Sequence, residues 1–228
     1  MIEAMHRITL GYFEIAYRRA GEGPPLVLLH GGVEDSRAWR RQIDDLSDEF
    51  SVYAWDAPGC GQSSEPSADW RMPEYADCLA AWLRAVGLVR PHILGLSWGS
   101  TLALEFCRRY ADVPASLVLV GAYAGGAGSL PPAEVARRLE GLLGTPDQPP
   151  ERMVADILPT LLPSTAPVSL VEEVKRILCE NAGVFHPLDI GQCSARWPKP
   201  TYATCWERSA SQHFCCTVRM TSDPLLQS

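Results

Sequence analysis

The sequence of 228 residues has no apolar stretch that reaches the roughly 20 residues a membrane span requires. Its first six residues lack a basic region followed by an apolar run, so we expect no secretory signal there. A basic stripe is also missing, because the 20 lysines and arginines are scattered and the formal net charge is −7. Such a charge gives no electrostatic reason to bind a polyanion. We therefore expect a soluble, cytoplasmic protein that binds neither a membrane nor nucleic acid.

Cysteine pairs at C-x-x-C spacing are missing as well, although the chain has eight cysteines. Three of them, Cys60, Cys78 and Cys107, are interpreted as small buried hydrophobic residues. The other five fall in the last fifty positions: Cys179, Cys193, Cys205, Cys215 and Cys216. A metal-binding tail built on these cysteines and His213 is an alternative, but their spacing fits no short zinc knuckle. We expect no metal and no cofactor.

The first half of the chain alternates short apolar runs with helical patterns, which is typical of an α/β fold with a mostly parallel sheet. The predicted strands are residues 7–10, 13–18, 26–30, 51–56, 92–96 and 116–120. The predicted helices are residues 36–46, with Ser36 as the cap, a helix through residue 86 with Pro73 near its start, and residues 101–110. The continuous apolar runs at 26–29 and 117–120 predict strands covered on both faces, so helices should lie on both sides of the sheet.

After Gly121 the pattern changes to three amphipathic segments separated by prolines, at residues 132–143, 152–162 and 170–181. A helical insertion late in an α/β chain predicts a cap over a site at the carboxyl edge of the sheet. Ordinary packing helices are the alternative.

Residues 95–99 read Gly-Leu-Ser-Trp-Gly and match G-x-S-x-G, between a predicted strand and a predicted helix. A sharp strand-to-helix turn exposes the serine hydroxyl, and the flanking glycines allow close approach of neighbouring backbone. Ser97 is therefore the predicted nucleophile. The backbone N–H of Trp98 would lie at a helix N-terminus, where it can stabilise negative charge on a tetrahedral intermediate.

Two glycine-rich loops follow other predicted strands. His30, Gly31 and Gly32 come directly after the strand at residues 26–29, and the N–H of Gly32 or Val33 is the candidate second donor of an oxyanion hole. His30 itself is either a pocket residue or a core histidine bonded to backbone. The second loop reads D-A-P-G-C-G-Q-S at residues 56–63.

Together, H-G-G, D-x-P-G-x-G-x-S and G-x-S-x-G, in this order, resemble the α/β-hydrolase family, over residues 8 to 187. Residues 95–104 look like the proline iminopeptidase branch, whereas residues 30–39 and 122–130 look more like small esterases and lactonases. The resemblance implies a cap after the sixth strand, a Ser-His-Asp triad and a small-molecule ester, lactone or amide substrate. Candidate pocket residues besides His30 and Trp98 are Tyr123, Leu130 and Leu139. The oligomeric state is left open.

The end of the chain departs from this family. The expected G-x-x-D after a seventh strand and the later G-H are both missing, and among the five histidines only His213 falls well beyond the cap. From residue 188 the apolar periodicity is lost, and the chain becomes rich in Cys, Trp, Pro, Ser and Thr.

A lost reading frame near Pro187 explains this change. When residues 188–227 are read from the third base of each codon, codon choices exist that encode a helix, a turn, an apolar strand and G-x-x-D. Some positions leave no choice: Trp197-Pro198 can yield only Ala, Trp206-Glu207 only Gly, and Met220-Thr221 only Asp, where the resemblance places the catalytic acid.

These observations predict an α/β core at residues 1–130, a helical cap at 131–187 and an aberrant, irregular tail at 188–228 with no sheet strand. A serine hydrolase without its Asp and His would be nearly inactive. One alternative is a non-catalytic binding protein that uses the same apolar cleft. Another is an intact enzyme in which His213, oriented by Asp223, reaches Ser97.

Overall fold

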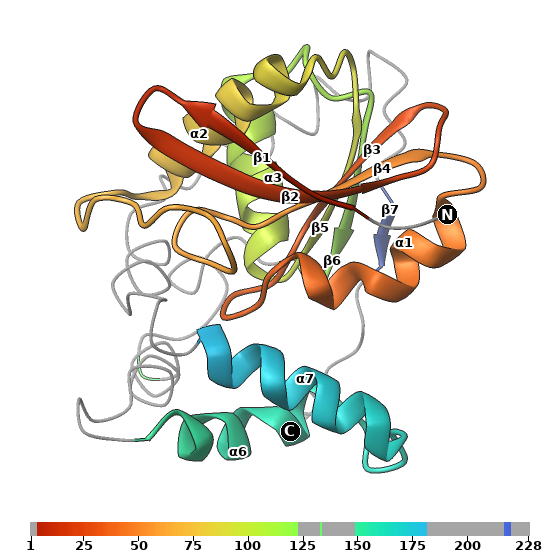
Figure 1. The fold of residues 1–228 in the computed structure, drawn as a ribbon, viewed down its shortest axis with the longest axis vertical. Coiled ribbons are helices and arrows are strands. Elements are labelled where there is room, and N and C mark those ends of the chain that lie inside the picture. The colour runs from red at the N-terminus through yellow and green to blue at the C-terminus, as the bar shows by residue number, and fades with distance from the viewer. Residues whose placement is uncertain (1–3, 123–132, 134–148, 182–216, 220–228) are drawn as a thin grey trace.

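A computed structural model describes residues 4–122, 133, 149–181 and 217–219 of the chain. Two strands come first, and from residue 25 to residue 120 strands alternate with helices; the strands join in one sheet with helices on its two faces (Figure 1). This is the α/β architecture that alternating apolar runs and helical patterns predict, so the predicted fold class is confirmed.

The sheet contains seven strands in the order β1-β2-β4-β3-β5-β6-β7. Their bounds are β1 Ala4–Leu10, β2 Phe13–Ala20, β3 Pro25–Leu29, β4 Ser51–Trp55, β5 His92–Leu96, β6 Ser116–Val120 and β7 Thr217–Arg219. β1 and β2 pair antiparallel, as do β2 and β4, whereas every pairing from β4 to β7 is parallel. The carboxyl ends of the parallel strands therefore share one edge of the sheet, which we call the carboxyl edge.

Helices cover both faces of the sheet. They are the 3-10 helix η1 Ser36–Trp39 and the α-helices α1 Arg40–Leu46, α2 Met72–Val86 and α3 Trp98–Arg109. Alternate residues of β3 point to opposite faces: Val27 and Leu29 pack in the larger core cluster with α2 and α3, and Leu26 and Leu28 pack in the smaller one with α1. The apolar run in β3 is thus buried on both sides, as expected.

Differences from the predicted elements in this half of the chain lie at their ends. The largest are that β1 begins at Ala4 and that α3 begins directly after Ser97. The predicted cap at Ser36 is wrong, because Asp35 is the N-cap of η1 and its carboxylate accepts from the backbone N–H of Arg37 at 2.9 Å. The Ser36 hydroxyl instead accepts from Nε of Arg18 at 3.1 Å.

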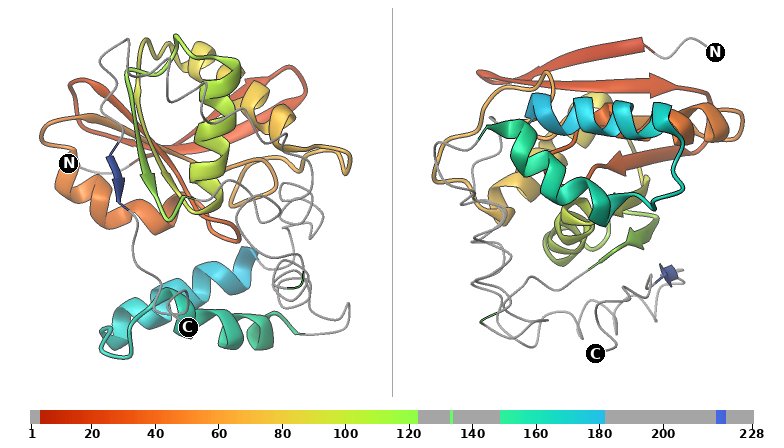
Figure 2. Two further views of the ribbon diagram at one scale, coloured as in Figure 1. Left: turned by 180° about the vertical axis from the view of Figure 1, so that it is seen from behind. Right: turned by 90° about the horizontal axis from the view of Figure 1, so that it is seen from below.

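Two further helices lie beyond the carboxyl edge of the sheet, side by side (Figures 1 and 2). They are α6 Pro150–Leu161 and α7 Val168–Asn181, and they correspond to the second and third predicted amphipathic segments. The first segment, at 132–143, falls outside the described residues apart from residue 133. None of the described helices is both long and apolar enough to cross a membrane.

The described part of the tail contains one short strand, which the sequence does not predict. Residues Thr217–Arg219 form β7 and pair parallel with Val118–Val120 of β6. The expectation that residues 188–228 contain no sheet strand is therefore wrong. An edge strand such as β6 presents unpaired backbone groups that an extended segment of almost any sequence can bind, so such pairing needs no apolar periodicity.

Candidate active site

The turn between β5 and α3 places Ser97 at the carboxyl edge. Ser97 has φ 52° and ψ −111°, a conformation that L-residues rarely adopt, and it is half-buried. Its backbone N–H donates to the carbonyl of Val120 in β6 at 2.8 Å. Strained backbone of this kind typically costs about 1–3 kcal/mol and persists only where the surrounding structure enforces it, often at functional sites.

The two glycines of the motif permit this turn because each sits where a side chain would collide with backbone. A Cβ on Gly99 would overlap the carbonyl oxygen of Leu29 and lie 2.6 Å from that of His30. A Cβ on Gly95 would overlap the carbonyl oxygen of Gly99 itself. The start of α3 can therefore approach the end of β3 closely only with glycine at these positions.

The loop after β3 lies directly beside this turn. A Cβ added to Gly31 would be 3.8 Å from the carbonyl oxygen of Leu96, the residue before the serine. Gly32 is half-buried and Val33 is buried. The structure thus brings the predicted oxyanion loop next to the predicted nucleophile.

The side chain of Glu34 stabilises this loop through a hydrogen bond to the loop's own backbone. Its carboxylate accepts the backbone N–H of Gly31 at 2.9 Å. Burial raises the pKa of the Glu34 carboxyl above its ordinary value, although the hydrogen bond from Gly31 acts in the opposite direction. The sequence analysis does not single out Glu34, since a lone carboxylate in a loop carries no motif.

His30 is fully buried and is held by backbone on both ring nitrogens. Nε2 accepts from the N–H of Ala57 at 3.0 Å, so Nδ1 carries the proton and donates to the carbonyl of Gly31 at 2.7 Å. This is the core histidine bonded to backbone that the sequence leaves open as an alternative. Its imidazole joins the loop after β3 to the loop after β4 and keeps no ring nitrogen available for a substrate.

The indole of Trp98 is also buried, at 2% exposure. It stacks on His30 with ring centroids 6.4 Å apart and meets Tyr75 edge-on at 5.2 Å. The side chain therefore anchors the first residue of α3 in the core, and its backbone N–H lies at the helix N-terminus, where partial positive charge accumulates.

The loop after β4 is organised by the buried carboxylate of Asp56. One oxygen accepts from the N–H of Ser36 at 2.8 Å and the other accepts from the N–H of Gln62 at 2.9 Å. Gly61 has φ 54°, and a Cβ there would collide with the Asp56 carboxylate. The acid and the glycine of the D-x-P-G-x-G-x-S motif thus shape the loop.

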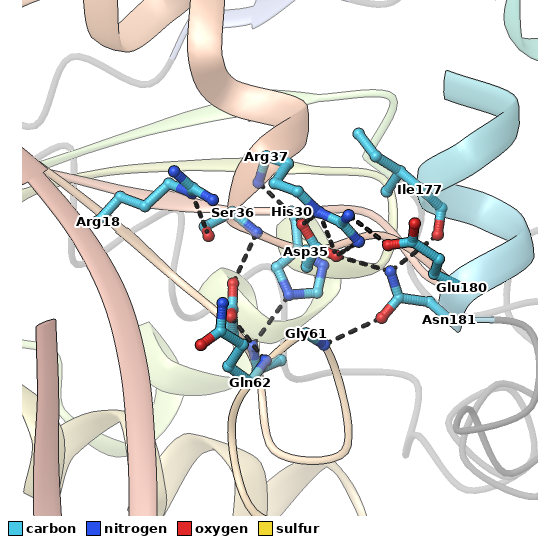
Figure 3. A network of polar contacts seen from close by, with 12 residues as sticks. Arg18, His30, Asp35, Ser36, Arg37, Gly61, Gln62, Ile177, Glu180 and Asn181 are labelled. Carbon is cyan, nitrogen blue, oxygen red and sulfur yellow. Dashed lines mark hydrogen bonds and ion pairs between the residues drawn. The ribbon is translucent and has the colours of Figure 1, made fainter. Parts of the chain in front are cut away.

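A polar network ties α7 to both loops (Figure 3). The Asn181 amide donates to Oδ2 of Asp35 at 2.7 Å, and its oxygen accepts the N–H of Gly61 at 2.9 Å. Arg37 pairs with Asp35 at 2.6 Å and also with Glu180. Burial alone would raise the pKa of Asp35, but hydrogen bonds from Arg37 and Asn181 outweigh it and hold the pKa below the ordinary value.

Each of the three histidines in the part of the chain that the structure describes either lies away from Ser97 or has other partners for its ring nitrogens. His6 stacks on Tyr17 of β2. His92 bonds the Ser116 hydroxyl at 2.7 Å at the opposite end of β5, and the ring nitrogens of His30 are occupied. Several predicted site residues lie outside the described residues, namely Tyr123, Leu130, Leu139, His213 and Asp223. Within residues 4–122 and 149–181, no group of three His, Cys, Asp or Glu side chains could hold a metal ion.

Comparison with known proteins identifies relatives of this arrangement. A family model described as alpha/beta hydrolase fold matches residues 24–209. Among solved structures, a thermophilic esterase from Thermogutta terrifontis superposes with a TM-score of 0.72 at 24% identity, covering 86% of this chain and 73% of the esterase.

Curated relatives match a shorter segment. A proline iminopeptidase from Heyndrickxia coagulans is 37% identical over 89 residues, which are 38% of this chain and 31% of the relative. Epoxide hydrolase 3 from Xenopus tropicalis is 35% identical over 101 residues, 43% of this chain and 28% of the relative. The match thus spans about a third of the length of these curated relatives.

We expect Gly99→Ala to destabilise the chain by about 3 kcal/mol or more, because its Cβ would overlap the end of β3 and force α3 outward. Gly87→Ala is the matched control. Gly87 has φ 78° but no atom within 4 Å of an added Cβ, so its cost should be only about 1–2 kcal/mol. Urea unfolding followed by tryptophan fluorescence measures both changes, and equal losses would contradict the close approach at Gly99.

We also expect Asp35→Asn to flatten the acid dependence of stability. Since the folded pKa of Asp35 is lowered, its carboxylate stabilises the fold above its unfolded pKa, near 4, and this contribution disappears as pH falls through the folded value. The difference in unfolding free energy between the wild type and the variant should therefore be largest near pH 7 and shrink below about pH 4. Urea titrations across this range test it, and a constant difference would show that Asp35 does not titrate as inferred.

Proposed function

Because the chain belongs to the α/β-hydrolase family, we propose that it derives from a serine hydrolase acting on an ester, lactone or amide of a small molecule. The observation that carries this proposal is the strained backbone of Ser97, with φ 52°, at the start of α3 and beside the glycine-rich loop after β3. A serine hydroxyl held on such a turn at the carboxyl edge of the sheet is the arrangement that nucleophilic attack requires.

In the proposed reaction, Ser97 Oγ attacks the substrate carbonyl carbon and loses its proton to a general base. The carbonyl oxygen then carries negative charge, which the N–H groups of Gly32 or Val33 and of Trp98 stabilise. The intermediate collapses as the protonated base gives its proton to the leaving alcohol or amine. In the second step the base takes a proton from water, the water oxygen attacks the acyl-serine, and the acid leaves as the base returns the proton to Ser97 Oγ. No cofactor takes part in this chemistry.

We further propose a division into a core at residues 1–130, a cap at 131–187 and a tail at 188–228. The position of α6 and α7 beyond the carboxyl edge supports the cap. In this arrangement Tyr123, Leu130 and Leu139 would contribute to the walls of the substrate pocket.

The proposal so far names no residue for the general base or for the acid of the triad. We propose that residues 188–228 are translated out of frame, so that the chain lacks the family's Asp and His and retains only the catalysis that binding and the oxyanion hole supply. The family match extends to residue 209 and so includes part of this tail. The nucleotide sequence at the codons for residues 186–189 decides between an intact frame and a shifted one.

A gene with one base restored near codon 187 should produce an enzyme whose esterase kcat exceeds that of the chain as given by about 10⁴-fold or more, since a general base is regained. Hydrolysis of p-nitrophenyl acetate and butyrate by both proteins measures the ratio. Equal rates would contradict the frame proposal and would instead favour His213 as the base.

In the restored protein, a fluorophosphonate probe should label Ser97, and Ser97→Ala should abolish that labelling. Ser116→Ala is the matched control, because Ser116 also lies beside a histidine but at the other end of the sheet. Its labelling should equal that of the parent. Labelling that survives Ser97→Ala would reject the nucleophile assignment.

A further inference from the structure

In the loop after β3, the residue with strained backbone is a valine and not one of the two glycines before it. Val33 has φ 57°, in the left-handed region, while neither Gly31 nor Gly32 before it has a positive φ. A β-branched side chain in this region is a genuine outlier whose backbone is strained. The conformation therefore needs contacts that hold it in place.

Two helices from beyond the sheet supply an apolar contact. Val33, at 8% exposure, forms a separate buried cluster with Val154 of α6 and Leu178 of α7, both at 1%. Among the described residues, Val33 is the only buried member of this cluster that does not come from α6 or α7. The strained residue of the proposed oxyanion loop is thus packed by the cap helices.

Asn181, three residues after Leu178, supplies a polar contact from the same helix. It is 2% exposed, and its amide hydrogens go to Asp35 Oδ2 at 2.7 Å and to the carbonyl of Ile177 at 2.9 Å. Its oxygen accepts the N–H of Gly61 at 2.9 Å. Since Asp35 only accepts and a backbone N–H only donates, this orientation of the amide follows from the chemistry of its partners.

Asp35, two residues after Val33, is therefore held by α7 at the same end that packs on the valine. Figure 3 shows Asn181 reaching from α7 to both Asp35 and Gly61. Removing the amide would leave the buried Asp35 carboxylate and the Gly61 N–H each without one partner, which destabilises the docked position of α7.

We propose that Asn181 is a positioning residue for the oxyanion loop: by fixing the end of α7 on Asp35 and Gly61, it keeps Leu178 against Val33 and so maintains the left-handed conformation of Val33. This inference rests on the proposed function for its catalytic meaning. The geometry of the loop would then depend on whether α7 is docked, and the cap would control the oxyanion donors as well as access to the site.

Hydrogen–deuterium exchange of the full chain tests the proposal without a substrate. We expect Asn181→Ala to speed exchange of the Gly31 amide, which donates to the Glu34 carboxylate at 2.9 Å in this loop, by about tenfold. Glycine adopts φ 57° without steric cost, so in a Val33→Gly background the same substitution should speed exchange by less than about twofold. Equal acceleration in both backgrounds would mean that Asn181 only adds general stability, and no acceleration in either would mean that it does not act on the loop; both overturn the proposal.

Two controls complete the experiment. Glu173→Gln removes another α7 contact, the ion pair with Arg40 at 3.9 Å, and should leave exchange of the Gly31 amide unchanged. If Asn181→Ala unfolds the core, which would appear as fast exchange of the Ile93 amide in β5, Leu178→Val replaces it in the same two backgrounds. Because the exchange needs no hydrolysis, a protein in which Ser97 labelling fails but the Val33-dependent effect is present would reject the proposed function and retain the positioning role.

Discussion

Several backbone N–H groups in the loops after β3 and β4 donate to buried side chains, and the arrangement of the candidate site depends on these side-chain acceptors. Asp56 accepts from Ser36 and Gln62, and His30 accepts from Ala57. A buried N–H left without an acceptor costs about 1–3 kcal/mol, so these side chains determine which loop conformations are accessible. The position of the turn at Ser97 relative to the loop after β3 depends on these acceptors.

The sheet and the turn at Ser97 are predictable from the sequence because their signals are local. Short apolar runs mark the buried strands, and Gly95 and Gly99 mark a place where backbone segments approach closely. The H-G-G and D-x-P-G motifs likewise lie in the loops after β3 and β4, directly after strands as the sequence predicts. Their chemistry is less local: His30 could be a pocket residue or a core residue, and only the positions of the Ala57 N–H and the Gly31 carbonyl distinguish the two.

Sequence patterns do not predict contacts between distant parts of the chain. Asn181 and Asp35 are separated by 146 positions, and an asparagine at the end of an amphipathic helix resembles an ordinary exposed helix terminus. The left-handed residue of the loop after β3 is Val33, although the preceding glycines could adopt such a conformation at lower cost. The sequence does not predict β7, because the pairing of this strand depends on the open edge of β6 and not on an apolar pattern in β7 itself.

The long separation between α7 and the loops has a consequence for the order of folding during synthesis. β1 to β6 with α1 to α3 are complete by residue 120, so these six strands and the two apolar clusters can assemble on the ribosome before α6 and α7 emerge. The amide that accepts the Gly61 N–H arrives 120 residues after it. The loops at the carboxyl edge therefore reach their final hydrogen bonding last, and until then a nascent chain exposes them to water and to chaperones with the sheet already formed.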